Sequence, residues 1–421
     1  KPFSTYTLQD RFDYVAGVTG MSTQEVTAFF NSPINDLSLA DALIEAPLGY
    51  FSLPLGLVKS LHINDQPYCV PMVTEETSVV AAMNKMASWV NKRGRLTAWT
   101  EGSAIIGQIQ ISKLSAPDLF NMKVETFKKD WIALANQGPV ASLVRRGGGV
   151  LDIQCRLIKR QKDQAMMGVL HVALDPCEAM GANQVTQVCE FLKPFIEKKT
   201  GEKVSMCILS NLTDTKITKA QVLIENIEKD LGKKIEEASY FAECDPYRAA
   251  THNKGIMNGI DAVLIATGND WRAVGAGLHS YAATRPSGGY RPLSTWKMDG
   301  KNLVGMFEGP IALGVVGGAT KVHPTAQFSL KCLGSPSANE LARVVASVGL
   351  LQNLGALRAL VEGGIIKGHM GLHIKNILYN LDANSQQKKA VGKKLMQKLQ
   401  IQKHISESDA IVALNAVLKA L

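Results

Sequence analysis

The spacing of apolar and polar positions predicts an alternation of helical and extended segments. Apolar residues recur every three or four positions over residues 9–46 and again over 337–361, which is typical of helices. Between residues 52 and 73, short apolar runs are separated by turn formers and predict strands. An Ala-rich apolar helix is expected to follow over residues 79–90.

Residues 105–207 carry a pattern of strand, helix, strand, strand and helix. The expected strands and helices lie at residues 105–111, 118–136, 150–158, 167–174 and 178–197. Helices that cover one face of a small sheet bury its apolar side, so this pattern predicts a compact α+β module with its own core. The glycine and charge placement at the start of the last helix suggests a phosphate ligand there.

Downstream, two short strands are expected over residues 303–318, and a helical tail follows residue 384. Glycines on both sides of His369 suggest a hinge that swings this tail over a site. His369 and His373 have the spacing of a zinc-binding helix, but Met370 stands where that motif needs a glutamate. We therefore expect no metal.

The stretch from residue 245 to 273 gathers polar side chains around a short apolar run, residues 262–266, which predicts a buried strand. Lys254 precedes the run and Asp270 follows it. If the chain folds back so that the two meet, Asp270 would orient Lys254 and keep it charged, ready to stabilise an oxyanion. A structural ion pair beside a tight turn is the alternative.

Composition narrows the class of protein. The 421 residues are 46% hydrophobic and 20% charged, which excludes the disordered classes and predicts two or three globular domains. The formal net charge of +9 and the lysine-rich helix expected over 386–403 leave a nucleic-acid-binding protein open. However, the chain lacks the basic-aromatic interleaving of such proteins.

The seven cysteines form no C-x-x-C pair, which argues for a reducing compartment and against a disulfide framework or a zinc cage. No apolar stretch reaches the length of a membrane span, and residues 1–13 lack the core of a signal peptide. We therefore expect a cytoplasmic protein without a membrane segment.

Five separated motifs together resemble one enzyme family. They are DPYRAATHNKGIMNGID at 245–261, ATGNDWRA at 266–273, EAMGAN at 178–183, GVVGGATK at 314–321 and KGHMGLH at 367–373. In this order and spacing they resemble the class II, bacterial-type 3-hydroxy-3-methylglutaryl-CoA (HMG-CoA) reductases, over nearly the whole chain.

The resemblance implies an α+β fold and a domain layout. A large mixed α/β domain (1–104 and 208–366) would bind the acyl-CoA, and an inserted small ferredoxin-like α+β domain (105–207) would bind the nicotinamide cofactor. A helical C-terminal flap would cover residues 367–421. The resemblance also implies a homodimer with active sites at the subunit interface.

The implied reaction is the reduction of HMG-CoA to mevalonate by two hydride transfers, with release of CoA. Lys254 would polarise the thioester carbonyl, and Asp270 would orient Lys254. His369 would protonate the leaving thiolate, and Glu76, expected in the first turn of the helix over 79–90, would be the acid of the second reduction.

The same family motifs imply binding residues. Ser78, Arg248 and Asn258 match positions that grip the carboxylate and hydroxyl of the substrate. Residues of the dinucleotide segment, with one further candidate, would bind the cofactor: Met180, Gly181, Ala182, Asn183 and Asn211.

Three departures from the family pattern bear on function. Ala46 stands where an asparagine is usual and cannot make the hydrogen bonds of an asparagine, so the contribution of this position to the acyl-CoA pocket is in doubt. Glu178 replaces an aspartate. NADH-preferring relatives carry an acid shortly after the Ala-Asn that ends the small-domain helix, and none follows Asn136 here. With Arg145 and Arg146 close by, NADPH is the preferred cofactor; NADH, and oxidative mevalonate degradation with NAD, stay open.

Overall fold

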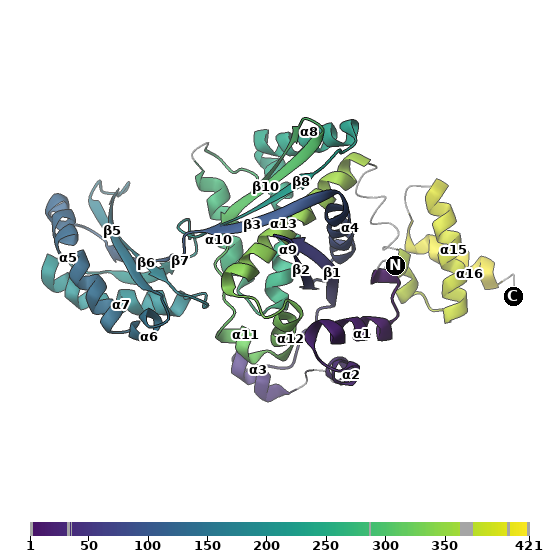
Figure 1. Cartoon of the computed structure of the whole chain (residues 1–421), viewed down its shortest axis with the longest axis horizontal. Helices are drawn as coiled ribbons and strands as arrows, with labels where there is room; N and C mark the ends of the chain where they lie inside the picture. The colour runs from purple at the N-terminus through teal and green to yellow at the C-terminus, as the bar shows by residue number, and fades with distance from the viewer. Residues whose placement is uncertain are drawn as a thin grey trace.

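The computed structural model describes residues 3–31, 34, 36–285, 288–362, 374–401 and 405–418. It is a mixed α+β structure whose sheets are antiparallel. In Figure 1, one small sheet with its helices lies at one end of the molecule, the C-terminal helices lie at the other, and the largest part of the chain lies between them.

The N-terminal region begins with a short 3-10 turn (Phe3–Thr5) and the predicted helices, which are α1 (Leu8–Thr19), α2 (Thr23–Asn31) and α3 (Leu37–Leu43). The predicted strands form a hairpin of β1 (Leu55–Ile63) and β2 (Gln66–Val73). Asn64 and Asp65 have φ of 51° and 64° and make its tight turn. Helix α4 (Val79–Arg93) follows, so Glu76 precedes the helix and does not lie in its first turn as expected.

A four-stranded sheet in the order β3-β8-β10-β9 forms the centre of the molecule. Its strands are β3 (Gly94–Glu101), β8 (Ile217–Ile224), β9 (Ser294–Asp299) and β10 (Asn302–Pro310). Residues 303–318 thus contain one strand and a loop, where two strands had been expected, because the glycines after Pro310 do not pair.

The long predicted helix is α13 (Ala338–Glu362), which packs against the central sheet and against α8 (Lys229–Cys244) and α9 (Pro246–Ala266). Among the described helices it alone is long and apolar enough to cross a membrane, which corrects the expectation that no apolar stretch reaches that length. Most of its residues are buried in the main core, which accounts for its apolar character.

Helix α9 corrects the strand predicted over residues 262–266, because these residues form its last turns. Ile256, Ile260 and Val263 are fully buried. Gly259 and Gly349 let α9 and α13 approach closely, since a Cβ on Gly259 would lie 2.9 Å from Gln352 Cβ. Helix α10 (Trp271–Thr284) begins directly after the turn that ends α9.

The second four-stranded sheet has the order β5-β6-β4-β7 and a core of its own. Its elements confirm the predicted helices and strands and add a fourth strand: β4 (Ile105–Ile111), α5 (Pro117–Gln137), α6 (Ala141–Val144), β5 (Gly149–Lys159), β6 (Met166–Asp175), α7 (Ala182–Thr200) and β7 (Met206–Ser210). Trp131 and Phe120 are its largest fully buried side chains.

The loop after β10 leads into α11 (Gly318–Val322) and α12 (Pro324–Cys332). Towards the C-terminus, residues 374–380 are helical, and α15 (Ser385–Ile401) and α16 (Glu407–Leu418) confirm the predicted tail. These helices share a separate small core that includes Ile377, Val391 and Leu395. His369 and His373 lie outside the described residues.

Candidate active site

Glu76 and Lys254 form the central contact of the site. Lys254 Nζ donates a hydrogen bond to Glu76 Oε2 at 2.6 Å, and Asn258 Nδ2 donates to Glu76 Oε1 at 3.4 Å. Lys254 and Asn258 are four residues apart in α9, so both lie on one face of this helix. The side chains of Lys254 and Glu76 are 60% and 38% exposed, which leaves the ion pair accessible to a substrate.

Asp270 lies elsewhere and corrects the expected contact with Lys254. Its Oδ1 accepts hydrogen bonds from the backbone N–H groups of Arg272 and Ala273, both at 3.1 Å, and caps α10. The Asn269 N–H bonds to Leu264 O, which holds this turn at the C-terminal end of α9. Ten residues of helix separate Leu264 from Lys254, about 15 Å at 1.5 Å per residue. One chain therefore does not bring Asp270 to Lys254.

Arg248 and Ser78 stand at the starts of two helices. Asp245 caps α9 by accepting from the backbone N–H groups of Tyr247 and Arg248, and Pro246 occupies its first position. The Arg248 side chain is half-buried, and this burial lowers the pKa of its guanidinium. Ser78 precedes α4 with φ of 78°, two residues after Glu76.

A buried polar network that the motifs alone did not reveal fixes α9. His252 is 1% exposed, and its Nε2 lies 2.8 Å from Ser294 Oγ. Ser294 Oγ and Trp296 Nε1 both donate to Asn353 Oδ1, at 3.0 and 2.8 Å. Burial lowers the pKa of His252 to about 3, so its imidazole is neutral. The only sequence signal for this role was the position of His252 two residues before Lys254.

Asn253 adds a second anchor beside His252. Its Nδ2 donates to Arg291 O at 2.9 Å, and its Oδ1 accepts from the Leu293 N–H at 2.8 Å. Together the two side chains tie the turn of α9 before Lys254 to the segment that enters β9. The position of the lysine is thus set by buried neighbours.

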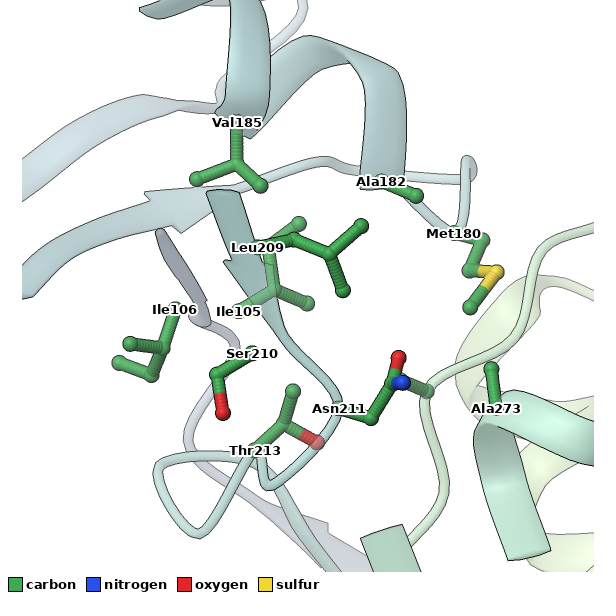
Figure 2. Close-up of a pocket in the computed structure, with 11 residues that line it drawn as sticks. Ile105, Ile106, Met180, Ala182, Val185, Leu209, Ser210, Asn211, Thr213 and Ala273 are labelled. Atoms are coloured by element: carbon green, nitrogen blue, oxygen red, sulfur yellow. The ribbon is translucent and has the colours of Figure 1, made fainter. Parts of the chain in front are cut away.

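The predicted cofactor segment, residues 178–183, leads into α7. Gly181 has φ of 89° and directly precedes this helix, a conformation that glycine adopts without strain. Met180, Ala182 and Asn211 line a small, mostly apolar pocket together with Ala273 of α10 (Figure 2). This pocket places three predicted cofactor residues beside the helix that Asp270 caps. Asn183 is the second residue of α7 and is not among the lining residues.

Arg145 and Arg146 lie in the exposed turn after α6. Cys177 Sγ donates to Arg146 O at 3.6 Å, and a Cβ on Gly148 would lie 2.5 Å from Asp175 O. The segment with both arginines therefore lies against the chain that enters the cofactor segment. Within the described part of the chain, neither guanidinium forms an ion pair with a carboxylate.

The other two departures from the family pattern have structural consequences. Glu178 Oε2 accepts from the Ala338 N–H at 2.6 Å, so this longer acid reaches the first residue of α13. Ala46 has φ of 51°, a left-handed conformation that asparagine tolerates better than alanine does. The described residues contain no cluster of histidine, cysteine and acidic side chains suited to a metal.

Comparison with known proteins identifies the family. Residues 7–374 match the model of the hydroxymethylglutaryl-coenzyme A reductase family. The chain is 45% identical to the HMG-CoA reductase of Archaeoglobus fulgidus, over 89% of this chain and 85% of the relative. A probable HMG-CoA reductase of Borreliella burgdorferi is 35% identical, over 85% of this chain and 84% of that protein.

Solved structures agree with this match. The class II HMG-CoA reductase of Streptococcus pneumoniae bound to NADPH superposes with a TM-score of 0.81 at 39% identity, covering 86% of this chain and 99% of that chain. The chain belongs to the class II HMG-CoA reductases. Its activity is the NAD(P)H-dependent reduction of HMG-CoA to mevalonate, and the expected resemblance is confirmed.

A second Streptococcus pneumoniae HMG-CoA reductase structure covers 99% of both chains, with a TM-score of 0.82 at 36% identity. Because the family accounts for both the motifs and the fold, the alternative of a nucleic-acid-binding protein is no longer needed to explain them.

Proposed function

We propose that this reductase works in the biosynthetic direction with NADPH, using Glu76, Lys254, Asp270 and His369 as catalytic residues. The observation that carries the catalytic assignment is the 2.6 Å contact between Lys254 and Glu76 on an open face of α9. An ammonium group held there by a carboxylate is suited to receive the negative charge that develops on a carbonyl oxygen.

In the first reduction, hydride adds to the thioester carbonyl carbon and Lys254 stabilises the oxyanion. Collapse of the hemithioacetal releases CoA thiolate, which His369 protonates. In the second reduction, hydride adds to mevaldehyde, and its oxygen takes up a proton supplied by Glu76. The hydrogen bond between Glu76 and Lys254 offers a short path for this proton.

Arg248, Ser78 and Asn258 would hold the substrate. A guanidinium presents parallel N–H donors that match a carboxylate, so Arg248 suits the free carboxylate of HMG-CoA. Its half-buried position strengthens such a contact. Asn258 already bonds to Glu76 and would orient it while meeting the substrate hydroxyl.

We also propose that each active site is shared by two subunits of a homodimer. Within one chain about 15 Å of helix separates Lys254 from Leu264, where the turn with Asp270 is held, whereas the family motif gives Lys254 and Asp270 a role in one site. Asp270 of one subunit, beside its own cofactor pocket, would therefore meet Lys254 of the other subunit.

Exposed apolar side chains support such an interface. Leu48 and Phe51, in the segment before β1, are fully or almost fully exposed at 102% and 91%. Tyr240, Phe241 and Tyr247 are exposed at the junction of α8 and α9, close to Arg248 in sequence. Large apolar groups clustered on a surface are typical of protein interfaces.

The domain division at residues 105, 207 and 367 remains our proposal. It is supported by the separate hydrophobic cores of the main part, the second sheet and the C-terminal helices, and by the strand order β5-β6-β4-β7, which is the order of a ferredoxin-like sheet. In this layout residues 367–421 act as a flap that carries His369. The seven free cysteines agree with a cytoplasmic location.

The proposed preference for NADPH rests on charge. Arg145 and Arg146 lie beside the cofactor segment without carboxylate partners among the described residues, and no acid follows Asn136 to repel a 2′-phosphate. The similar enzyme of Streptococcus pneumoniae was solved with NADPH bound. Met180, Ala182 and Asn211 would hold the nicotinamide end of the cofactor. The nicotinamide supplies the hydride when it is bound.

The test is cofactor oxidation by the purified protein with HMG-CoA, run with NADPH and with NADH while free CoA thiol is measured. We expect two cofactors oxidised per thiol released, with a higher kcat/KM for NADPH. A higher kcat/KM for NADH, together with rapid NAD-dependent oxidation of mevalonate, would instead assign the enzyme to mevalonate degradation.

A further inference from the structure

Asn269 links the turn that presents Asp270 to a loop after β10. Its Oδ1 accepts from the Gly314 N–H at 2.9 Å, and its Nδ2 donates to Thr267 Oγ1 at 3.0 Å. Its own N–H donates to Leu264 O at 2.8 Å. Asn269 thus joins the end of α9 to the loop that contains Gly314.

Gly314 in turn lies directly on the cofactor segment. A Cβ on Gly314 would lie 2.5 Å from Met180 N and 2.9 Å from the carbonyl carbon of Ala179, so only glycine allows this approach. The next residue, Val315, donates its N–H to Glu178 O at 2.9 Å. The loop partner of Asn269 is therefore fixed against the backbone that is expected to hold the cofactor.

A second connection runs through α10. Ala273, whose N–H bonds to Asp270, lines the same pocket as Met180 and Asn211 (Figure 2). Further along α10, a Cβ on Gly277 would lie 2.5 Å from Asn211 O. Asp270 is consequently held between two structures that both end at the cofactor pocket. The Asn269 amide bonds the turn to the loop, and Thr320 Oγ1 of α11 also donates to this turn, at Thr267 O and Gly268 O.

We propose that Asn269 is a positioning residue that holds Asp270 in register with the reactive end of the cofactor. This inference rests on the proposed roles of Asp270 and of the cofactor segment. Without the amide, the turn and the loop lose their shared hydrogen bond, and Asp270 shifts relative to Met180. A displacement of about 1 Å is enough to lower a reaction rate by about a hundredfold.

The test compares Asn269→Ala and Asn269→Asp with the wild-type dimer. In Asn269→Ala we expect kcat to fall about tenfold to a hundredfold, while KM for HMG-CoA changes less than about twofold because Arg248 is untouched. Asn269→Asp keeps the acceptor for the Gly314 N–H but loses the donor to Thr267. Its kcat should therefore lie between the kcat of the wild type and that of Asn269→Ala.

Asn91 offers a matched control, because its amide makes a similar bridge away from the cofactor segment. Asn91 Nδ2 donates to Ser60 O at 3.0 Å, and the His62 N–H donates to Asn91 Oδ1 at 3.2 Å. Asn91→Ala should lower Tm comparably and leave kcat unchanged. Equal kcat losses in Asn269→Ala and Asn91→Ala, measured on folded dimers, would overturn the positioning role.

Asp270→Asn, assayed in parallel, separates this inference from the proposed function. If the wild-type protein reduces HMG-CoA and Asp270→Asn does not, the proposed role of Asp270 stands; normal kcat in Asn269→Ala then refutes only the role of Asn269. If Asp270→Asn remains fully active, the catalytic assignment itself fails and the role of Asn269 fails with it.

Discussion

Glu76 Oε2 lies 2.6 Å from Lys254 Nζ, although 178 positions separate the two residues in the chain. The glutamate comes from the loop between β2 and α4, and the lysine from the middle of α9. Both elements pack on the main core, so the hydrophobic core determines where Glu76 meets Lys254. The contact between these two proposed catalytic residues is therefore formed without substrate.

This contact makes Glu76 the first residue to test. Glu76→Gln keeps the size of the side chain and its acceptor for Asn258 but removes the proton donor. We expect kcat for reduction of free mevaldehyde to fall about a hundredfold or more, with little change in KM for HMG-CoA. Steady-state kinetics with each substrate measures this.

Glu75→Gln is the matched control for that variant. It removes the same charge one residue away, from an exposed side chain that makes no described contact with Lys254. We expect it to keep nearly full activity. Equal losses in both variants would mean that a general change of charge, and not proton transfer by Glu76, lowers the rate.

The proposed shared site predicts complementation between inactive subunits. Lys254→Ala and Asp270→Ala should each be inactive as homodimers. Random re-association gives heterodimers in half of the population, each with one intact site, so about a quarter of wild-type activity should return. The measurement is NADPH oxidation after the two variants are dissociated, mixed and re-associated.

A mixture of Lys254→Ala with Glu76→Ala is the control, because these two residues contact each other within one chain. Every heterodimeric site then lacks one of them, and no activity should return. Recovery in this control, or none in the first mixture, would contradict a site built from Lys254 of one subunit and Asp270 of the other.

Cofactor preference provides a third prediction. Arg146→Ala should raise KM for NADPH about tenfold to a hundredfold, since a charge-assisted contact contributes about 1.5–3 kcal/mol, and should leave KM for NADH unchanged. Arg156→Ala, which removes an arginine bonded to His171 on the same small sheet, is the control and should change neither. Equal effects on both cofactors would refute a role in binding the 2′-phosphate.

Several elements were predictable because local rules decide them. The turn residues Asn64 and Asp65 between two apolar runs specify a hairpin, and the structure has it there. The alternation of helices and strands over residues 105–207 likewise predicted the elements of the second sheet, apart from its last strand. In both cases the apolar pattern and the turn chemistry point to the same structure.

The strand expected over residues 262–266 failed for a physical reason. The last part of α9 is buried on several sides, so Ala262, Val263, Leu264 and Ala266 are all buried and residues 262–266 form a continuous apolar run instead of a stripe. Such a run does not distinguish a buried helix from a buried strand. The expected contact of Lys254 with Asp270 in one chain required the chain to fold back around this run, whereas α9 continues to Ala266 and Asp270 caps α10.

Buried His252 gives a prediction about pH and stability. Its ordinary pKa of 6.5 applies to the unfolded chain, and burial lowers its pKa in the folded protein to about 3. Between these values the unfolded state binds a proton that the folded state does not, so stability falls as pH falls from 6.5 towards 3 and returns as pH rises. The loss attributable to His252 between pH 7 and pH 4 is about 3 kcal/mol.

His252→Gln tests this assignment, because a glutamine amide can still donate to Ser294 Oγ but does not ionise. The variant should be less stable than wild type at pH 7, by about 1–2 kcal/mol. The difference should shrink on acidification and reverse between about pH 6 and pH 5. Urea unfolding at a fixed protein concentration and at pH 7, 6, 5 and 4 measures it. If the free energies of unfolding of wild type and variant change in parallel with pH, another group causes the acid sensitivity, because the variant lacks only the ionisable imidazole.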